Sequence, residues 1–133
     1  MSPRSSRSAA IFDLDNDGDL DVVVNDFNAE PQILISNLSE RKPIHWVKIV
    51  LHGTASNRNG LGAAVRVIAG GRTHYRYNDG KSGYLAQSVL PLYFGLGNAK
   101  TIDRIEIDWP SGRKQSLTTD LRQNQTISIT EPQ

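Results

Sequence analysis

A strict alternation of hydrophobic and charged residues constrains the fold of this chain more than any other feature. Between Arg104 and Trp109 every second residue is hydrophobic, and the same period recurs in three further segments, 47–51, 90–94 and 126–130. Successive side chains of a β-strand point to opposite faces, so a period of two predicts strands that bury one face. The phase of the pattern places Ile105, Ile107 and Trp109 together in a hydrophobic core.

Turn signals separate these segments, and no window shows a clear helical period. Gly70 and Gly71 form a two-residue hairpin signal, and 110–112 reads as a turn with proline at its second position. At most one helical turn is expected, at 118–122. Seven or so short strands with frequent turns predict an all-β fold, an antiparallel β-sandwich or jelly-roll-like module.

Composition narrows the classes of protein that the chain can represent. Its 133 residues suffice for one domain, or one domain with a small appended unit. The net charge is +1 with scattered Lys and Arg, so no nucleic-acid partner is expected. The chain has no cysteine, which excludes disulfides, thiolate zinc sites and a cysteine nucleophile. No apolar run approaches the ~20 residues of a membrane-spanning helix, so membrane insertion is not expected.

The most distinctive motif is a run of aspartates that includes one glycine. Five carboxylates occupy every second position, at Asp13, Asp15, Asp17, Asp19 and Asp21. Ca²⁺ takes six to eight oxygen ligands, and such a loop supplies them from side chains, with a backbone carbonyl from Asp19 and a sharp turn at Gly18. Two carboxylates about 5 Å apart repel by ~3 kcal/mol at an effective dielectric of about 20. A cation, or protonation, must relieve this repulsion.

The flanks of the motif indicate a calcium loop between two strands. An EF-hand requires a glutamate at position 12 of the loop, where this chain has Val24, and 22–24 is typical of a strand rather than a helix. We therefore predict a structural Ca²⁺ bound between strands at 9–12 and 20–24, with a third strand at 32–36. A bare, solvated aspartate turn is the alternative.

Two parts of the chain resemble known families. Residues 9–37, with the Asp loop and the hydrophobic strand after it, resemble a single FG-GAP/VCBS-type repeat, the unit of integrin-like β-propellers. Residues 45–133 resemble the ASPIC/UnbV domain. The matching motifs are Asn57-Arg58-Asn59-Gly60-Leu61-Gly62-Ala63, Gly80-Lys81-Ser82-Gly83-Tyr84, Gln87-Ser88, Phe94-Gly95-Leu96-Gly97, Trp109-Pro110-Ser111-Gly112, Asn124-Gln125 and Glu131.

Composition and the resemblance together divide the chain into four segments. The polar stretches at 1–8 and 38–44 are interpreted as a flexible lead and a linker. The resemblance assigns the repeat to 9–37 and the β domain to 45–133. It also implies an extracellular or cell-surface protein and supplies no established catalytic residue. A propeller needs four or more blades, and this chain holds one incomplete blade. Because such a unit alone would be marginally stable in water, we expect residues 9–36 to pack on the β domain. Upstream blades of a longer parent protein are the alternative partners.

Exposed aromatic rings are the candidate ligand surface. The chain offers Trp46, Tyr75, Tyr77, Tyr84 and Tyr93, and such rings can stack on sugars. Tyr75 and Tyr77 are two positions apart on one strand, so they are both buried or both exposed.

One carboxylate pair suggests catalysis. Glu106 and Asp108 share a strand face about 6.6 Å apart, near the separations used by glycosidases. Their alternation with Ile105 and Ile107 is equally typical of an ordinary solvent-facing surface.

Three functions are consistent with these features. The leading one is a non-catalytic, calcium-stabilised extracellular binding or adhesion module that recognises a polysaccharide or protein surface. The second is a carbohydrate-binding module that uses the exposed aromatics. The third is a polysaccharide-active enzyme that depends on Glu106 and Asp108 or on a metal in the Asp loop.

Overall fold

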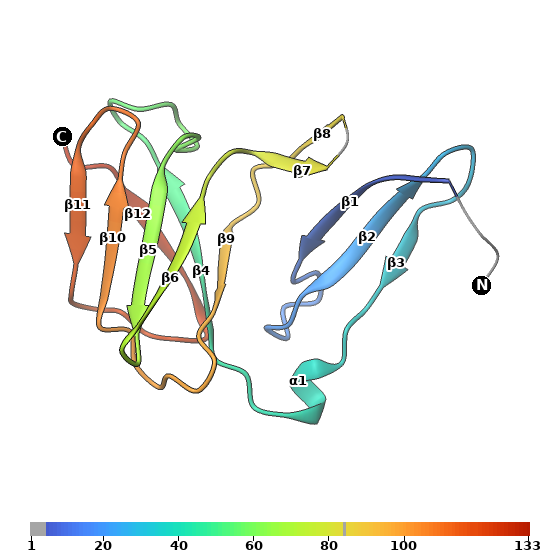
Figure 1. The fold of residues 1–133 in the computed structure, drawn as a ribbon, viewed down its shortest axis with the longest axis horizontal. Coiled ribbons are helices and arrows are strands. Elements are labelled where there is room, and N and C mark those ends of the chain that lie inside the picture. The colour runs from blue at the N-terminus through green and yellow to red at the C-terminus, as the bar shows by residue number, and fades with distance from the viewer. Residues whose placement is uncertain (1–4, 84) are drawn as a thin grey trace. The chain divides into compact units, whose positions relative to one another are not determined.

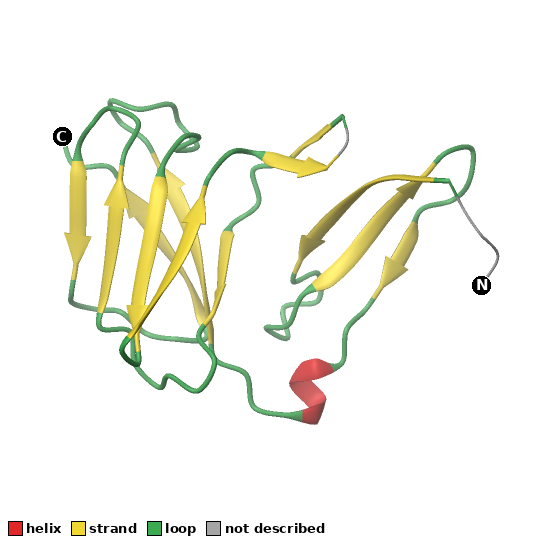
Figure 2. Ribbon diagram, in the orientation of Figure 1, coloured by secondary structure: helices red, strands yellow, loops and turns green. Residues whose placement is uncertain are grey.

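The computed structural model describes residues 5–83 and 85–133, which form an all-β protein, as predicted (Figures 1 and 2). The chain divides into two compact units. We call Met1–Pro43 with Gly80–Val89 the N-terminal unit, and Ile44–Asp79 with Leu90–Gln133 the sandwich unit. Residues 80–89, expected within the C-terminal β domain, thus cluster with the N-terminal unit.

Two sheets build the sandwich unit. The four-stranded sheet has the order β11-β10-β5-β6 and is antiparallel throughout. Its strands are β5 (Ala64–Ala69), β6 (Arg72–Tyr77), β10 (Arg104–Asp108) and β11 (Lys114–Leu117). The three-stranded sheet has the order β12-β4-β9, with β4 (Trp46–His52), β9 (Leu92–Gly95) and β12 (Gln125–Thr130). β12 runs parallel to β4, a pairing that the sequence did not predict.

The core lies between these two sheets. Val47 and Ile49 of β4 are buried, and so are Val67 of β5 and Ile105 of β10. Trp109 joins the same cluster at 3% exposure, as the phase of the alternation predicted. Burying apolar surface at roughly 25 cal/mol per Å² is the main stabilisation available to a chain without disulfides.

The hairpin between β5 and β6 forms as expected. Ala69 pairs with Arg72, and the two glycines between them have φ of +56° and +73°. Positive φ at both central positions is characteristic of the two-residue hairpin turn whose twist matches that of the paired strands. The turn fixes the register of β6, and with it the face on which the β6 side chains lie.

The N-terminal unit is a five-stranded sheet in the order β3-β2-β1-β7-β8. Its strands are β1 (Ser6–Phe12), β2 (Asp21–Asp26), β3 (Gln32–Leu34), β7 (Lys81–Gly83) and β8 (Ala86–Gln87). β1 begins at Ser6, so part of the segment expected as a flexible lead is a strand. A single helix turn, α1 (Leu38–Arg41), lies in the predicted linker. Among the described residues, no helix is both long and apolar enough to span a membrane.

Within its described residues, the N-terminal unit buries aspartates rather than large hydrophobic side chains. Asp13, Asp19, Asp21 and Asp26 are buried, whereas every buried hydrophobic residue belongs to the sandwich unit. Exposed apolar side chains include Ile11, Phe27, Ile33, Leu34 and Ile35. The two units are therefore stabilised by different interactions.

Replacing one core isoleucine tests the sandwich. We expect Ile105→Ala, at a side chain with 0% exposure, to lower the free energy of unfolding by about 2–5 kcal/mol, because it leaves a cavity between the sheets. Ile68→Ala, at a half-buried position on the outer face of the same sheet, is the matched control and should cost less. Guanidinium unfolding followed by the fluorescence of Trp46 and Trp109, both in the sandwich unit, measures the difference; equal losses would contradict the assignment.

Candidate functional site

The Asp loop connects β1 to β2 and gathers three of its carboxylates. Oxygen atoms of Asp13, Asp15 and Asp21 all lie within 4.8 Å of one another, with Asp13 and Asp21 buried and Asp15 exposed. Left-handed backbone at Asn16 (φ +64°) and Gly18 (φ +96°) folds the loop back on itself. Three anionic oxygen donors this close are a ligand set that suits a hard cation such as Ca²⁺.

Backbone amides hold these carboxylates in place. Asp21 accepts hydrogen bonds from the amides of Leu14 and Ser36, each at 2.8 Å, and Asp13 accepts one from Gly18 at 3.0 Å. The carboxylate of Asp21 thus joins the loop to the segment that follows β3. The carboxylates that form the cluster therefore also hold the loop in its conformation through hydrogen bonds.

Two of the five predicted aspartates also connect the loop to α1. Asp19 accepts a hydrogen bond from the amide of Ser39 at 2.8 Å, and Asp17 accepts one from the Ser39 hydroxyl. Burial raises the pKa of Asp19, but the Ser39 amide and the hydroxyls of Ser36 and Ser39 outweigh it, so the net pKa is below the ordinary value. Asp17 and Asp19 therefore tie the loop to α1, while Asp13, Asp15 and Asp21 form the candidate metal site.

The aromatic residues fall on two separate surfaces. Tyr75 and Tyr77 are 52% and 55% exposed, and their pairing with Arg66 and Ala64 places them on the outer face of the four-stranded sheet. Trp46 and Tyr93 stack, with ring centroids 6.1 Å apart, in the three-stranded sheet. The fifth aromatic candidate, residue Tyr84, lies outside the described residues.

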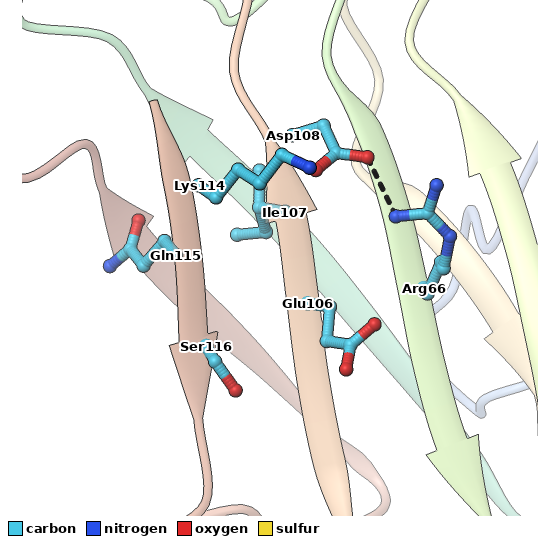
Figure 3. Close-up of a pocket in the computed structure, with 7 residues that line it drawn as sticks. All are labelled: Arg66, Glu106, Ile107, Asp108, Lys114, Gln115 and Ser116. Carbon is cyan, nitrogen blue, oxygen red and sulfur yellow. Dashed lines mark hydrogen bonds and ion pairs between the residues drawn. The ribbon is translucent and has the colours of Figure 1, made fainter. Parts of the chain in front are cut away.

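A shallow groove of about 440 Å³ lies on the outer face of the four-stranded sheet (Figure 3). The outward-facing polar side chains that line it come from three neighbouring strands: Arg66, Glu106, Asp108, Lys114 and Ser116. Arg66 donates to Asp108 at 2.7 Å, and beside the groove Arg104 donates to Glu106 at 2.7 Å.

The environment of the carboxylate pair does not favour acid catalysis. The hydrogen bond from Arg66 lowers the pKa of Asp108, and together with the electrostatic attraction of Arg66 and Lys114 it outweighs the effect of burial. A glycosidase pair needs one carboxylic acid that stays protonated, with a raised pKa. Asp108 is held ionised, and Glu106 receives the Arg104 guanidinium, so both carboxylates are arranged to accept hydrogen bonds.

The side chain of Glu131, which directly follows β12, makes an extensive set of hydrogen bonds. Only 1% exposed, it accepts hydrogen bonds from the amides of Thr54, Ala55 and Ser56 at 2.8, 3.0 and 2.7 Å, and from the hydroxyls of Ser56 and Ser111. Burial raises its pKa, but these donors more than compensate and lower the pKa to about 2. Glu131 therefore joins the segment after β12 to the loop at 54–56 and to the turn that contains Ser111.

Sequence reasoning matched Glu131 to a family motif but gave it no role. Its partners lie 75–77 and 20 positions earlier in the chain, so local spacing carried no signal for them. Asn78 acts similarly: its amide donates to the carbonyls of Asn59 and Gly60. The motifs at 57–63 and 109–112 are thus held by buried polar side chains that stabilise the fold.

Glu131→Gln should lower the melting temperature by at least about 5 °C, because the amide places an N–H group against donors that need an acceptor. Glu106→Gln, at an exposed ion pair of the same sandwich, is the matched control and should change it by less than about 2 °C. Calorimetry of both variants tests this; a Glu131→Gln melt as mild as the control would contradict the role of the carboxylate.

The same carboxylate predicts acid sensitivity. Its pKa in the folded chain, about 2, lies below the ordinary value of 4.5, so its contribution to stability is complete above about pH 4.5 and is lost as the pH falls toward 2. The melting temperature of the wild type should fall over this range, and that of Glu131→Gln should fall less steeply. Parallel slopes for the two proteins would argue against this linkage.

Comparison with known proteins agrees with the motifs of the sandwich unit. Residues 53–133 match the family model described as ASPIC and UnbV. Over 126 residues the chain is 28% identical to cartilage acidic protein 1 of Mus musculus. This alignment covers 92% of the chain and 19% of the mouse protein, so the chain spans about a fifth of that relative's length.

Proposed function

The chain belongs to the ASPIC and UnbV family, and from that premise we propose that it is a non-catalytic, calcium-stabilised extracellular module that binds a polymer or protein surface. The observation that carries the calcium is the convergence of Asp13, Asp15 and Asp21 within 4.8 Å. The extracellular location is supported by the family and by the likeness to a protein named for cartilage.

Calcium would act here as a structural ion. Asp13 precedes the turn of the loop and Asp21 begins β2, so a cation held by both would link the ends of two paired strands. It would also neutralise carboxylates that repel one another by several kcal/mol at this separation. The N-terminal unit, whose described residues include no buried large hydrophobic side chain, has the most to gain from such an ion.

Calorimetry with and without calcium tests this proposal. We expect millimolar Ca²⁺ to raise the melting temperature relative to EDTA, because an ion that binds only the folded state adds about 2.7 kcal/mol at 100 times its dissociation constant. Asp15→Asn, at the exposed member of the cluster, should remove most of this response. Asp120→Asn, at an exposed aspartate of the sandwich unit, should keep it. The same melting temperature in calcium and in EDTA would rule out the structural ion.

We also propose that the N-terminal unit packs against further propeller-type blades of a longer parent protein. The register of its strands puts Ile11, Val22 and Leu34 on one face and Ala10, Val23 and Ile33 on the other. A sheet that is apolar on both faces is typical of one that is covered on both sides. The resemblance of 9–37 to an FG-GAP/VCBS-type repeat supports the same partner, as does the greater length of the mouse relative.

A hydrophobic dye tests the uncovered sheet. The isolated chain should enhance the fluorescence of anilinonaphthalene sulfonate, and a double variant Ile33→Ser, Leu34→Ser, which makes one exposed residue of each face polar, should reduce that enhancement. The matched control, Leu61→Ser, changes an exposed leucine of the sandwich unit and should leave the signal nearly unchanged. A dye signal that is absent, or that only the control reduces, would contradict this partner.

Carbohydrate binding is a second candidate function, and the groove beside Tyr75 and Tyr77 favours it. The enzymatic alternative is less favoured, because the carboxylates of this groove are ion-paired and Asp108 has a lowered pKa.

A further inference from the structure

We infer that the outer face of the four-stranded sheet is the binding surface of the proposed module, and that its ligand is a neutral polysaccharide chain. This inference rests on the proposed binding function and specifies its site and ligand class. The surface consists of the groove on β5, β10 and β11 together with the two tyrosines of β6.

Strand register arranges these side chains in two rows across the sheet. The first row, read from β11 to β6, is Ser116, Glu106, Arg66 and Tyr75. The second row is Lys114, Asp108, Ala64 and Tyr77. Neighbouring strands are about 4.8 Å apart and the rows about 6.6 Å apart, so the surface is as wide as several sugar rings. Each row ends in an exposed aromatic ring.

The polar groups of the surface are held in place before any ligand binds. Arg66 donates to Asp108 in the other row at 2.7 Å, and its guanidinium lies 5.8 Å from the centroid of the Tyr75 ring. A side chain that is already ordered loses less conformational entropy on binding. Carboxylate oxygens that accept one hydrogen bond can accept more, and the guanidinium has further donors. Sugar hydroxyl groups, which both donate and accept, match this pairing.

Tyr75 and Tyr77 supply the apolar part of the contact. They stand two positions apart on β6, so their Cα atoms are about 6.6 Å apart along the edge strand of the sheet. Ala64 lies between Asp108 and Tyr77 in the second row. Its side chain is only a methyl group, so the surface is depressed between the carboxylate and the ring. A sugar chain that crosses the strands would stack on a tyrosine and reach the Arg66–Asp108 pair in the groove.

The balance of charge favours a neutral ligand over a polyanion. Three cations on this face, Arg66, Arg104 and Lys114, are offset by Glu106 and Asp108, and both carboxylates are paired with arginines. Nucleic acids and sulfated glycans require clusters of unneutralised cations. A protein partner would find few apolar anchors, because the exposed large hydrophobic residues of the sandwich unit are Tyr75, Tyr77 and Leu61.

Affinity electrophoresis of the full chain tests the inference, with mixed-linkage β-glucan, xylan, galactomannan and heparin cast separately into native gels. We expect at least one neutral polysaccharide to retard the chain, with little dependence on salt. The double variant Tyr75→Ala, Tyr77→Ala should weaken this binding by about tenfold or more, because ring contacts contribute on the order of a factor of ten. The matched control, Thr126→Ala with Ser128→Ala on exposed positions of β12 in the other sheet, should bind like the wild type.

Three results would overturn the inference: no retardation by any of the neutral polysaccharides, retardation by heparin alone that disappears with salt, or unchanged binding by the tyrosine variant. A second variant, Asp108→Asn, keeps the shape of the groove and should also weaken binding. Its circular dichroism and melting curve, and those of the tyrosine variant, show whether a loss reflects misfolding.

The same gels in calcium and in EDTA separate this inference from the proposed function. The binding surface lies in the sandwich unit and the calcium cluster in the N-terminal unit. A calcium-dependent melt without glycan binding would overturn only the ligand assignment. Glycan binding without any calcium response would support the surface and overturn only the structural ion.

Discussion

The alternation of side chains across the two sheets of the sandwich is the constraint on which the rest of this protein depends. In β10 it buries Ile105 and Ile107 and turns Glu106 and Asp108 outward. One strand thus supplies residues to both the core and the groove. A slip of one residue in register would exchange the two faces, placing carboxylates between the sheets. The fold and the binding surface are therefore determined by one pattern.

Buried polar side chains explain what the family motifs do. Glu131 collects three backbone amides and two hydroxyls, and Asn78 holds two carbonyls of the loop at 57–63. A buried carboxylate is tolerated only when its hydrogen bonds are satisfied, as they are here. These contacts hold loops of the sandwich and do not involve the outer face of the four-stranded sheet. The motifs at 57–63, 109–112 and Glu131 therefore account for the scaffold and do not identify a ligand.

Local features of the fold were predictable from the sequence, whereas long-range ones were not. The turn at Gly70 and Gly71 and the burial of Trp109 follow from patterns within a few residues. The parallel pairing of β12 with β4 joins segments about 80 positions apart, and no local signal encodes it. In the candidate metal site, the spacing of the aspartates predicted four side-chain ligands and a backbone carbonyl ligand at Asp19. The structure separates Asp17 and Asp19 from the others because Ser39 supplies them with hydrogen-bond donors.

The two units are stabilised by different interactions, and this difference is relevant to function. The sandwich unit encloses a continuous apolar core, whose burial is its main source of stability. The N-terminal unit concentrates charge in its buried positions and leaves apolar residues such as Ile33 exposed. In the proposed function, an ion would supply the counter-charge for its aspartates, and neighbouring blades would cover its sheet faces. The N-terminal unit would then link the module to a larger assembly, while the sandwich would present the proposed surface to a ligand.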